Sequence, residues 1–148
     1  MYGFSVSKRM GRIVAIDYGR KRCGVAVTDP LRLSVNPKPT VAPSDLQTVI
    51  RDLYDSGELD TVVLTRSQHA DGSDNPIQAD IYRFAERLQK AYPALQIDYQ
   101  DEFASSKEAM QHLISSGVRR QKRAQPGQLD AAAAGIILER YLRDSGIW

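Results

Sequence analysis

Acidic residues at three separated places are the side chains of this sequence best suited to catalysis. Asp17 ends a short apolar run, Asp101 and Glu102 follow another, and Asp130 lies in an alanine-rich C-terminal segment. Magnesium prefers oxygen ligands and keeps several of its waters, so a few carboxylates together with a phosphate group suit it. Such ions can activate a water and stabilise the leaving oxygen of a phosphodiester. Our hypothesis is that Asp17, Glu102 and Asp130 meet around a bound cation, because three converging carboxylates repel one another without one.

Asp130 is the most informative of these residues. Helical spacing places its carboxylate on one face with Ala134, Ile137 and Tyr141. A carboxylate that is desolvated beside apolar side chains without a partner is costly. Two ordinary alternatives stay open, since Asp130 could cap the helix after residues 125–128 or lie at the solvated margin of the apolar stripe. That stripe consists of Leu129, Ala132, Ala133, Ile136, Ile137 and Leu142.

Positive charge gathers at two places, although the net charge of the chain is only +2. Phosphate binding depends on where the charge lies and not on its sum. Ordinary solvated surface is the alternative explanation for each cluster. The clusters are Lys8, Arg9, Arg12, Arg20, Lys21 and Arg22 around the first apolar run, and Arg119, Arg120, Lys122 and Arg123 in a later stretch.

Composition excludes several classes of protein. A single cysteine, Cys23, can form neither an intramolecular disulfide nor a thiolate zinc site. The apolar runs are far shorter than the roughly 20 residues of a membrane span, and the N-terminus has no signal-peptide core. We therefore expect a cytoplasmic protein without membrane contact, and the sequence reveals no dimer interface. Cys23 and His112 are expected to be packing or surface residues, His69 a solvated loop residue, and Tyr18 either a base-stacking residue or a cover for the sheet.

Hydrophobic periodicity and turn residues predict the order of the elements. Residues 12–28 are typical of a β-hairpin with a glycine-containing turn, and the prolines within 33–41 favour an edge strand. Further strands are expected at 61–64 and 95–99, a polar loop at 66–75, and helices at 45–56, 76–91, 106–116 and 128–142. No repeat or linker interrupts the chain, so we predict one domain over 1–148 with flexible ends at 1–10 and 144–148.

This order of elements predicts an α/β fold. Antiparallel strands followed by right-handed βαβ crossovers make a mixed central sheet, with an N-terminal antiparallel hairpin and helices on both faces. Ligands of open α/β sheets bind at the carboxyl ends of the strands. Asp17 and the pair Asp101–Glu102 fall at such ends, which supports the hypothesis that they share a site.

Several stretches of the sequence form a recognisable series. The first, at 13–30, reads Ile-Val-Ala-Ile-Asp-Tyr-Gly-Arg-Lys-Arg-Cys-Gly-Val-Ala-Val-Thr-Asp-Pro. The others are 71–73 with 84–88, the acidic pair 101–102 with the serines at 105–106, and the basic 117–123 with 130–142. In this order they resemble the YqgF/RuvX family of Holliday-junction-resolvase-like proteins, to which pre-16S rRNA nuclease activity is ascribed. The resemblance covers residues 11–143.

The resemblance implies an RNase H-like fold and a nuclease that uses Mg²⁺, or Mn²⁺ in its place, to mature ribosomal RNA at the 5′ end of 16S rRNA. By motif position, Asp17, Glu102 and Asp130 are the catalytic and metal-binding acids, and Asp101 is a further metal ligand. The residues expected to contact phosphates of a nucleic acid are Lys21, Arg22, Arg119, Arg120, Lys122 and Arg123.

Two glycines match the family pattern, and two stretches of the sequence depart from it. Gly19 and Gly24 are expected to lie close to the phosphate, where a side chain would intrude. Residues 64–67, Leu-Thr-Arg-Ser, stand where the family usually has a Gly-Leu-Pro turn, and Phe103 stands where it usually has arginine. Three functions stay open: a nuclease for structured RNA, a DNA junction resolvase that would need a two-fold dimer, and a non-catalytic nucleic-acid-binding protein.

Overall fold

The computed structural model describes residues 11–148 of the chain. Lys8, Arg9 and the expected flexible end at 1–10 therefore lie outside the described residues. The strands are β1 Arg12–Asp17, β2 Cys23–Thr28, β3 Val35–Val41, β4 Leu59–Arg66 and β5 Gln96–Asp101. The helices are the 3-10 helix η1 Pro43–Asp45, α2 Leu46–Asp55, α3 Ile77–Ala91, α4 Ser105–Ser115, α5 Arg120–Arg123 and α6 Gln128–Asp144.

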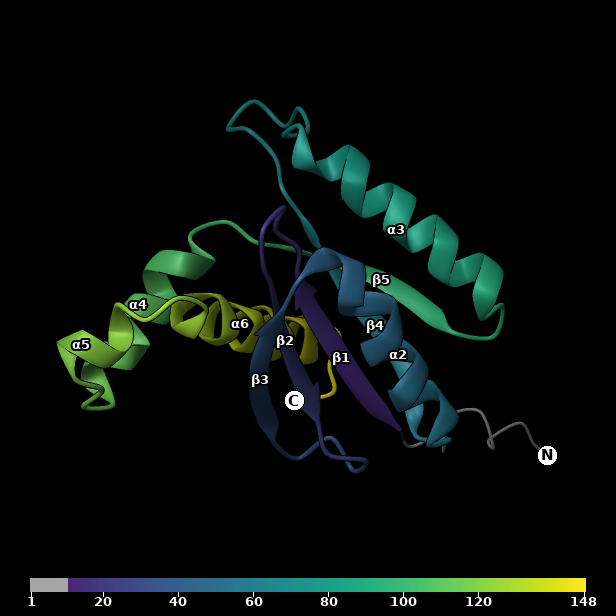
Figure 1. Ribbon diagram of the computed structural model, residues 1–148, viewed down its shortest axis with the longest axis horizontal. Coiled ribbons are helices and arrows are strands. Elements are labelled where there is room, and N and C mark those ends of the chain that lie inside the picture. The colour runs from purple at the N-terminus through teal and green to yellow at the C-terminus, as the bar shows by residue number, and fades with distance from the viewer. Residues whose placement is uncertain (1–10) are drawn as a thin grey trace.

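One five-stranded sheet in the order β3-β2-β1-β4-β5 organises these elements (Figure 1). β2 pairs antiparallel with β1 and with β3, as the predicted hairpin and edge strand require. β4 pairs parallel with β1 and with β5, and α3 leads from one to the other. The predicted mixed sheet is confirmed. β1, β4 and β5 run in one direction, so their last residues lie at the same end of the sheet, which we call the carboxyl end.

Apolar side chains alternate along β1 and supply a core on each face of the sheet. Val14 and Ile16 point to one face, whereas Ile13 and Ala15 point to the other. The first face is covered by α2 and α3, whose buried apolar residues are Leu46, Ile50, Ile81, Phe84, Ala85 and Leu88. The second face is covered by α6, through Ala134, Ile137, Leu138 and Leu142. The prediction of helices on both faces is therefore confirmed.

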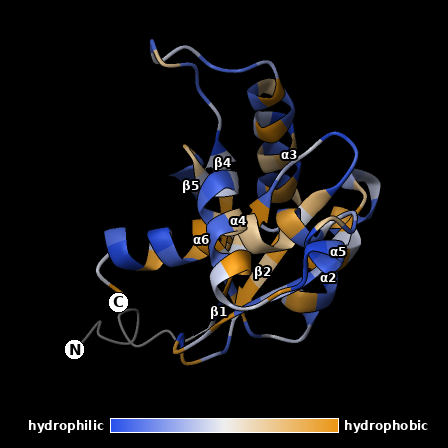
Figure 2. Cartoon of the chain, turned by 90° about the vertical axis from the view of Figure 1, so that its left-hand side faces the viewer, coloured by the Kyte–Doolittle hydropathy of each residue, from blue (hydrophilic) through white to orange (hydrophobic). Residues whose placement is uncertain are grey.

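Helix α3 shows how the hydrophobic pattern chooses the buried face. Hydrophobic and hydrophilic residues alternate along its turns, and the segment that leads into it from β4 is mainly hydrophilic (Figure 2). Ile81, Phe84 and Leu88 recur at three- to four-residue spacing and are at most 1% exposed. Burying such a side chain stabilises the fold by about 1.5–3 kcal/mol, so this face fixes α3 against the sheet.

The element boundaries differ from the predictions at strand and helix ends, since β4 spans 59–66 and not 61–64, and β5 spans 96–101 and not 95–99. The helix expected at 45–56 is α2, preceded by the 3-10 turn η1, and the basic stretch contains the short helix α5. The expected flexible end at 144–148 makes contacts, because the Trp148 indole N–H donates to the Arg32 carbonyl at 2.8 Å. Whether this end is mobile stays a prediction. Among residues 11–148, no helix is both long and apolar enough to cross a membrane.

Candidate active site

The end of β1 brings Asp17 next to the first turn of α6. Asp17 is paired in the antiparallel ladder with Gly24 of β2. A Cβ atom on Gly24 would lie 2.1 Å from the Asp130 carbonyl oxygen and 3.3 Å from the Ala134 Cβ. Only glycine therefore lets α6 approach β2 this closely. The close approach places Asp130 beside the ladder position that Asp17 occupies.

The end of β5 brings Glu102 to the same end of the sheet. β4 and β5 are paired as far as Arg66 and Asp101, and the Glu102 N–H then donates to the Arg66 carbonyl at 3.3 Å. Ala104 has φ 56° and reverses the chain before α4. A left-handed conformation costs a residue with a side chain about 1–2 kcal/mol, so the surrounding hydrogen bonds must hold this turn in place.

Asp17 carries the clearest electrostatic sign of a shared site. Its pKa is raised from 3.8 to about 7, first by burial and then by the negative charges of Glu102 and Asp130. Carboxylates act on one another in this way only when they lie near one another. The structure thus brings together the three acids that the sequence singled out, from β1, the end of β5 and α6.

Glu102 is surrounded by groups that act on its pKa in opposite directions. Burial raises this pKa, the hydroxyls of Ser67 and Thr65 lower it, and the negative charge of Asp101 raises it again. Thr65 Oγ1 is buried and has no hydrogen-bond partner of standard geometry among the described residues. A buried hydroxyl without a partner is uncommon, and it lies close enough to Glu102 to stabilise the carboxylate charge.

Asp130 lies in the first turn of α6, which is favourable for an acid because the helix dipole is positive there. Gly127 and not Asp130 is the N-cap of this helix, so the N-cap alternative is wrong. The Asp130 side chain is 32% exposed, as a position at the solvated margin of the stripe requires. Its Oδ2 accepts a hydrogen bond of 2.9 Å from Arg22 Nε.

The side chain of Asp101, the expected fourth metal ligand, stabilises the turn that follows β5. Its Oδ1 accepts a 3.0 Å hydrogen bond from the Phe103 N–H, and its side chain is exposed. The charge of Asp101 acts on Glu102 and not noticeably on Asp17. Its part in metal binding stays a prediction.

The chemistry of the acidic residues fits a hard divalent cation. Carboxylates and a spare hydroxyl offer oxygen ligands, and the mutual repulsion felt by Asp17 would be relieved by positive charge. As the side chains stand, no group of three or more His, Cys, Asp or Glu within residues 11–148 is arranged to hold a metal ion. Arg22 holds the Asp130 carboxylate instead, so cation binding by all three acids requires this side chain to turn.

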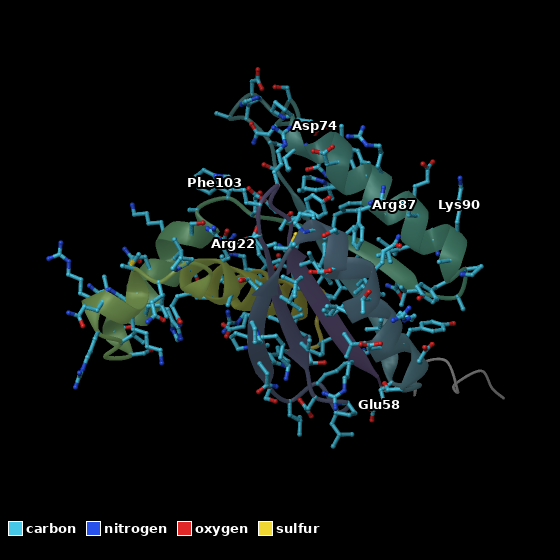
Figure 3. The ribbon with its side chains drawn as sticks, viewed as in Figure 1. Arg22, Glu58, Asp74, Arg87, Lys90 and Phe103 are labelled. Atoms are coloured by element: carbon cyan, nitrogen blue, oxygen red, sulfur yellow. The ribbon has the colours of Figure 1, made fainter. Side chains whose placement is uncertain are left out.

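The expected phosphate-binding residues occupy different situations. Lys21, Arg119, Arg120 and Lys122 are exposed, and none of them forms an ion pair with another described residue. Arg123 is half-buried and donates to the Val118 carbonyl at 2.8 Å, which holds the turn before α5. Arg22 lies at the carboxyl end of the sheet (Figure 3), whereas α5 packs against α4 and α6 farther from it (Figure 1).

Two residues at the site were missed from the sequence. Thr65 and Ser67 are 0% and 4% exposed and support Glu102. Ser67 is itself held by Gln78, whose side-chain oxygen accepts from the Ser67 N–H at 2.7 Å. The available signal was a pair of hydroxyl residues at the end of a strand that is otherwise apolar. We expected a loop from residue 66, whereas β4 continues to Arg66.

At Gly19 and Gly24 of the hairpin, the packing of neighbouring backbone by itself requires a residue without a side chain. A Cβ on Gly19 would lie 2.4 Å from the Arg22 carbonyl oxygen, so a tight turn excludes a side chain there. Gly24 admits the α6 backbone. Backbone atoms of other residues therefore account for both glycines, and whether either lies near a bound phosphate stays a prediction.

The other residues considered in the sequence are Tyr18, Cys23, His69 and His112. Tyr18 packs against Phe84, with ring centroids 5.8 Å apart, so it covers the sheet. Cys23 is buried, and burial raises the pKa of its thiol to about 11, which suits a core residue. His69 is exposed in the polar loop and His112 is exposed on α4.

Comparison with known proteins gives the same picture over nearly the whole chain. A family model described as RuvX, Holliday junction resolvase, matches residues 11–144. A "Putative pre-16S rRNA nuclease" of Chlorobium luteolum is 41% identical over 138 residues, covering 93% of this chain and 98% of the relative. Another protein of that name, from Chlorobium chlorochromatii, is 42% identical over 131 residues, or 88% of this chain and 94% of the relative.

A solved structure agrees with the fold. It is T. thermophilus RuvC in complex with Holliday junction substrate, with a TM-score of 0.54 and 15% identity, and the match covers 91% of this chain and 96% of that one. The predicted RNase H-like α/β fold is confirmed by this likeness. The family match over residues 11–144 and the curated relatives show that the chain belongs to the RuvX family.

Proposed function

We propose that this protein is a divalent-metal-dependent endonuclease that hydrolyses phosphodiester bonds in structured RNA. The observation that carries the proposal is the convergence of Asp17, Glu102 and Asp130, seen in the raised pKa of Asp17. Acids at the ends of β1 and β5 and in the first turn of α6 raise the pKa of Asp17, and such perturbed groups cluster at functional sites.

Ribosomal RNA is the substrate that the relatives favour. Two relatives at 41% and 42% identity carry the name of a pre-16S rRNA nuclease. We propose that this chain acts on the precursor of 16S rRNA at its 5′ end, in the cytoplasm. Exposed positive charge at Lys21, Arg119, Arg120 and Lys122 supports a polyanionic substrate, because such side chains position a nucleic acid through its phosphates.

The chain's own residues have distinct tasks in this proposal. Asp17, Glu102 and Asp130 would hold the cation, Mg²⁺ or Mn²⁺. The Ser67 and Thr65 hydroxyls orient Glu102 and favour its charged form. Arg22, released from Asp130, would contact a phosphate. A divalent cation, when bound, supplies positive charge for the developing charge of the phosphodiester and lowers the pKa of a water.

Resolution of DNA junctions is the second candidate. The family description names a Holliday junction resolvase, and the RuvC structure with a similar fold contains a Holliday junction. Symmetric cutting of a four-way junction requires a two-fold dimer. The oligomeric state in the presence of a junction therefore separates this candidate from the RNA nuclease.

A cleavage assay tests the proposal directly. Labelled precursor rRNA fragments and a four-way DNA junction are incubated with Mg²⁺, Mn²⁺ or a chelator. We expect metal-dependent cleavage of the RNA, and a loss of at least about a hundredfold in Asp17→Asn, Glu102→Gln and Asp130→Asn, since about 2.7 kcal/mol of missing stabilisation gives that factor. Asp52→Asn, an exposed acid on α2, is the control.

Each other outcome has a definite meaning. Cleavage that survives in chelator or in Asp17→Asn rejects the proposed metal site. Cleavage of the DNA junction alone favours the resolvase. Binding without cleavage in every metal favours a non-catalytic nucleic-acid-binding protein.

A further inference from the structure

Phe103 is an apolar side chain left in solvent directly beside a proposed catalytic acid. It follows Glu102 in the chain and is 78% exposed. Exposure by itself means little, because single exposed apolar residues are common, and Leu33 is 74% exposed as well. The difference is position. Leu33 precedes β3 at the opposite end of the sheet, whereas Phe103 shares the carboxyl end with Arg22 (Figure 3).

The backbone around Phe103 is held firmly although its ring is free. The Phe103 N–H donates to Asp101 Oδ1 at 3.0 Å, and the Ser105 N–H donates to the Glu102 carbonyl at 2.9 Å. The next residue, Ala104, has the left-handed φ of 56°, and its carbonyl accepts from the Glu108 N–H at 3.0 Å. Strained residues of this kind gather at functional sites. The turn therefore fixes the backbone from which the ring projects.

The chemistry of a phenyl ring determines what it can contact there. It has no hydrogen-bonding group, and its flat apolar faces suit another flat apolar surface. Each phosphate of a nucleic acid is joined to a base through a single sugar. A phosphate held by the acids therefore brings its neighbouring base within reach of the residue that follows Glu102.

We propose that Phe103 stacks on an unpaired base of the nucleotide next to the scissile phosphate. This inference rests on the proposed nuclease function and specifies its substrate: RNA with an unpaired nucleotide at the position of cleavage. A base inside a continuous duplex has its faces covered by its neighbours and offers no surface to the ring. Stacking of this type tolerates any base, because every base has a π-face.

Binding of two matched RNAs tests the inference. One carries 2-aminopurine at an unpaired position in an internal loop, and the other carries it in a continuous duplex of equal length. Affinity and 2-aminopurine fluorescence are measured for the wild type, Phe103→Ala, Phe103→Trp and Leu33→Ala. Ca²⁺ is present to neutralise the acids, and the RNA is checked for integrity on a gel afterwards.

The expected result is selective. Stacking contributes about 1–3 kcal/mol per base, so Phe103→Ala lowers affinity for the looped RNA by about 5- to 150-fold and removes the fluorescence change. Affinity for the duplex stays within about twofold. Phe103→Trp retains the preference for the loop, and Leu33→Ala behaves as the wild type. The thermal melting of Phe103→Ala is recorded to show that the variant is folded.

Contrary results separate the two proposals. If the wild type binds and cleaves RNA while Phe103→Ala binds the looped RNA as Leu33→Ala does, the stacking contact is wrong and the nuclease stands. Equal losses on loop and duplex also reject stacking on an unpaired base. If the wild type binds neither RNA, both proposals fail.

Discussion

Arg22 Nε lies 2.9 Å from Asp130 Oδ2, so a residue expected to bind phosphate is paired with a residue expected to bind metal. Their side chains are 47% and 32% exposed, respectively. Ion pairs with this exposure contribute about 0.2–1 kcal/mol. The pair is therefore weak enough to open when a cation or a phosphate arrives. Until then, the positive charge of Arg22 compensates the negative charge of Asp130 near Asp17 and Glu102.

Removing Arg22 is expected to strengthen cation binding and to weaken nucleic-acid binding. Arg22→Gln frees Asp130, so Mn²⁺ should bind up to about fivefold more tightly, which corresponds to the upper limit for an exposed pair. RNA affinity should fall, because a side chain that can bind a phosphate is removed. Free Mn²⁺ is measured by electron paramagnetic resonance and RNA binding by fluorescence anisotropy. Arg20→Gln is the matched control, since Arg20 belongs to the same turn but pairs with Asp80 at 3.4 Å. Identical effects of the two substitutions would contradict this role of Arg22.

Asp17 should make the metal-free protein less stable as the pH rises. Below about pH 4 the carboxyl is protonated in the folded and the unfolded protein. Between about pH 4 and 7 the unfolded chain has released the proton that the folded chain keeps, so the free energy of unfolding falls with pH. The shift from 3.8 to about 7 limits this loss to about 4 kcal/mol, at 1.36 kcal/mol per pH unit. Above about pH 7 the loss is complete.

Urea unfolding in chelator at several pH values measures this effect. Asp17→Asn should match the wild type near pH 4 and exceed its stability at pH 8. Asp71→Asn has the opposite expectation, because hydrogen bonds from Ser73 lower the pKa of Asp71 and its charge favours the folded state. If the free energy of unfolding of wild type and of Asp17→Asn changes with pH in parallel, the pKa of Asp17 is not raised in the folded protein.

Gly24→Ala should disturb the approach of α6 to the sheet. Its Cβ would lie 2.1 Å from the Asp130 carbonyl oxygen, so the helix must shift. Overpacking of this kind typically costs about 1–3 kcal/mol. Gly135→Ala within α6 is the matched control, because the nearest atom to its Cβ would be Pro37 Cγ at 3.5 Å. Alanine in a helix interior is favoured over glycine by about 0.5–1 kcal/mol. Equal urea midpoints for the two variants would argue against the close approach of α6 to Gly24.

The basic residues before and within α5 should divide into two groups. Neutralising Arg119, Arg120 and Lys122 with glutamine is expected to weaken RNA binding and flatten its salt dependence, by about 0.9 in slope for each duplex phosphate that is no longer neutralised. Stability should hardly change, since these side chains are exposed. Arg123→Gln should instead lower the melting temperature, because it removes the hydrogen bond to the Val118 carbonyl. Affinities measured at low and at physiological salt decide this prediction, and an unchanged slope in the triple variant counts against phosphate binding there.

Local patterns in the sequence predicted the elements well where those patterns are strong. The hairpin at 12–28 contains β1 and β2, and the prolines at 37 and 39 do lie in an edge strand. Periodic apolar residues located α3 and α6. Both ends of β4 were misjudged, because its polar residues at either end do not continue the apolar run, and the strand spans Leu59–Arg66 and not 61–64.

The candidate site was only partly accessible from the sequence. Residue types and the family resemblance singled out Asp17, Glu102 and Asp130, which are distant in the chain. They could not reveal that Gly24 is a packing residue, that Asp101 serves its own turn, or that Arg22 pairs with Asp130. Each of these facts depends on which side chain or backbone atom arrives from another element.

The sequence by itself determined the alternation of strands and helices and the chemical nature of the acids, because hydrophobic periodicity and side-chain type are local properties. Tertiary structure alone decided the electrostatics of the site. The pKa of Asp17 is raised first by burial, and then because strand pairing with Gly24 admits α6 with Asp130 and parallel pairing of β4 with β5 delivers Glu102. Charges repel according to their separation in space, and strand pairing and packing bring Asp17 close to Glu102 and Asp130, which are 85 and 113 residues away in the chain (102 − 17 and 130 − 17).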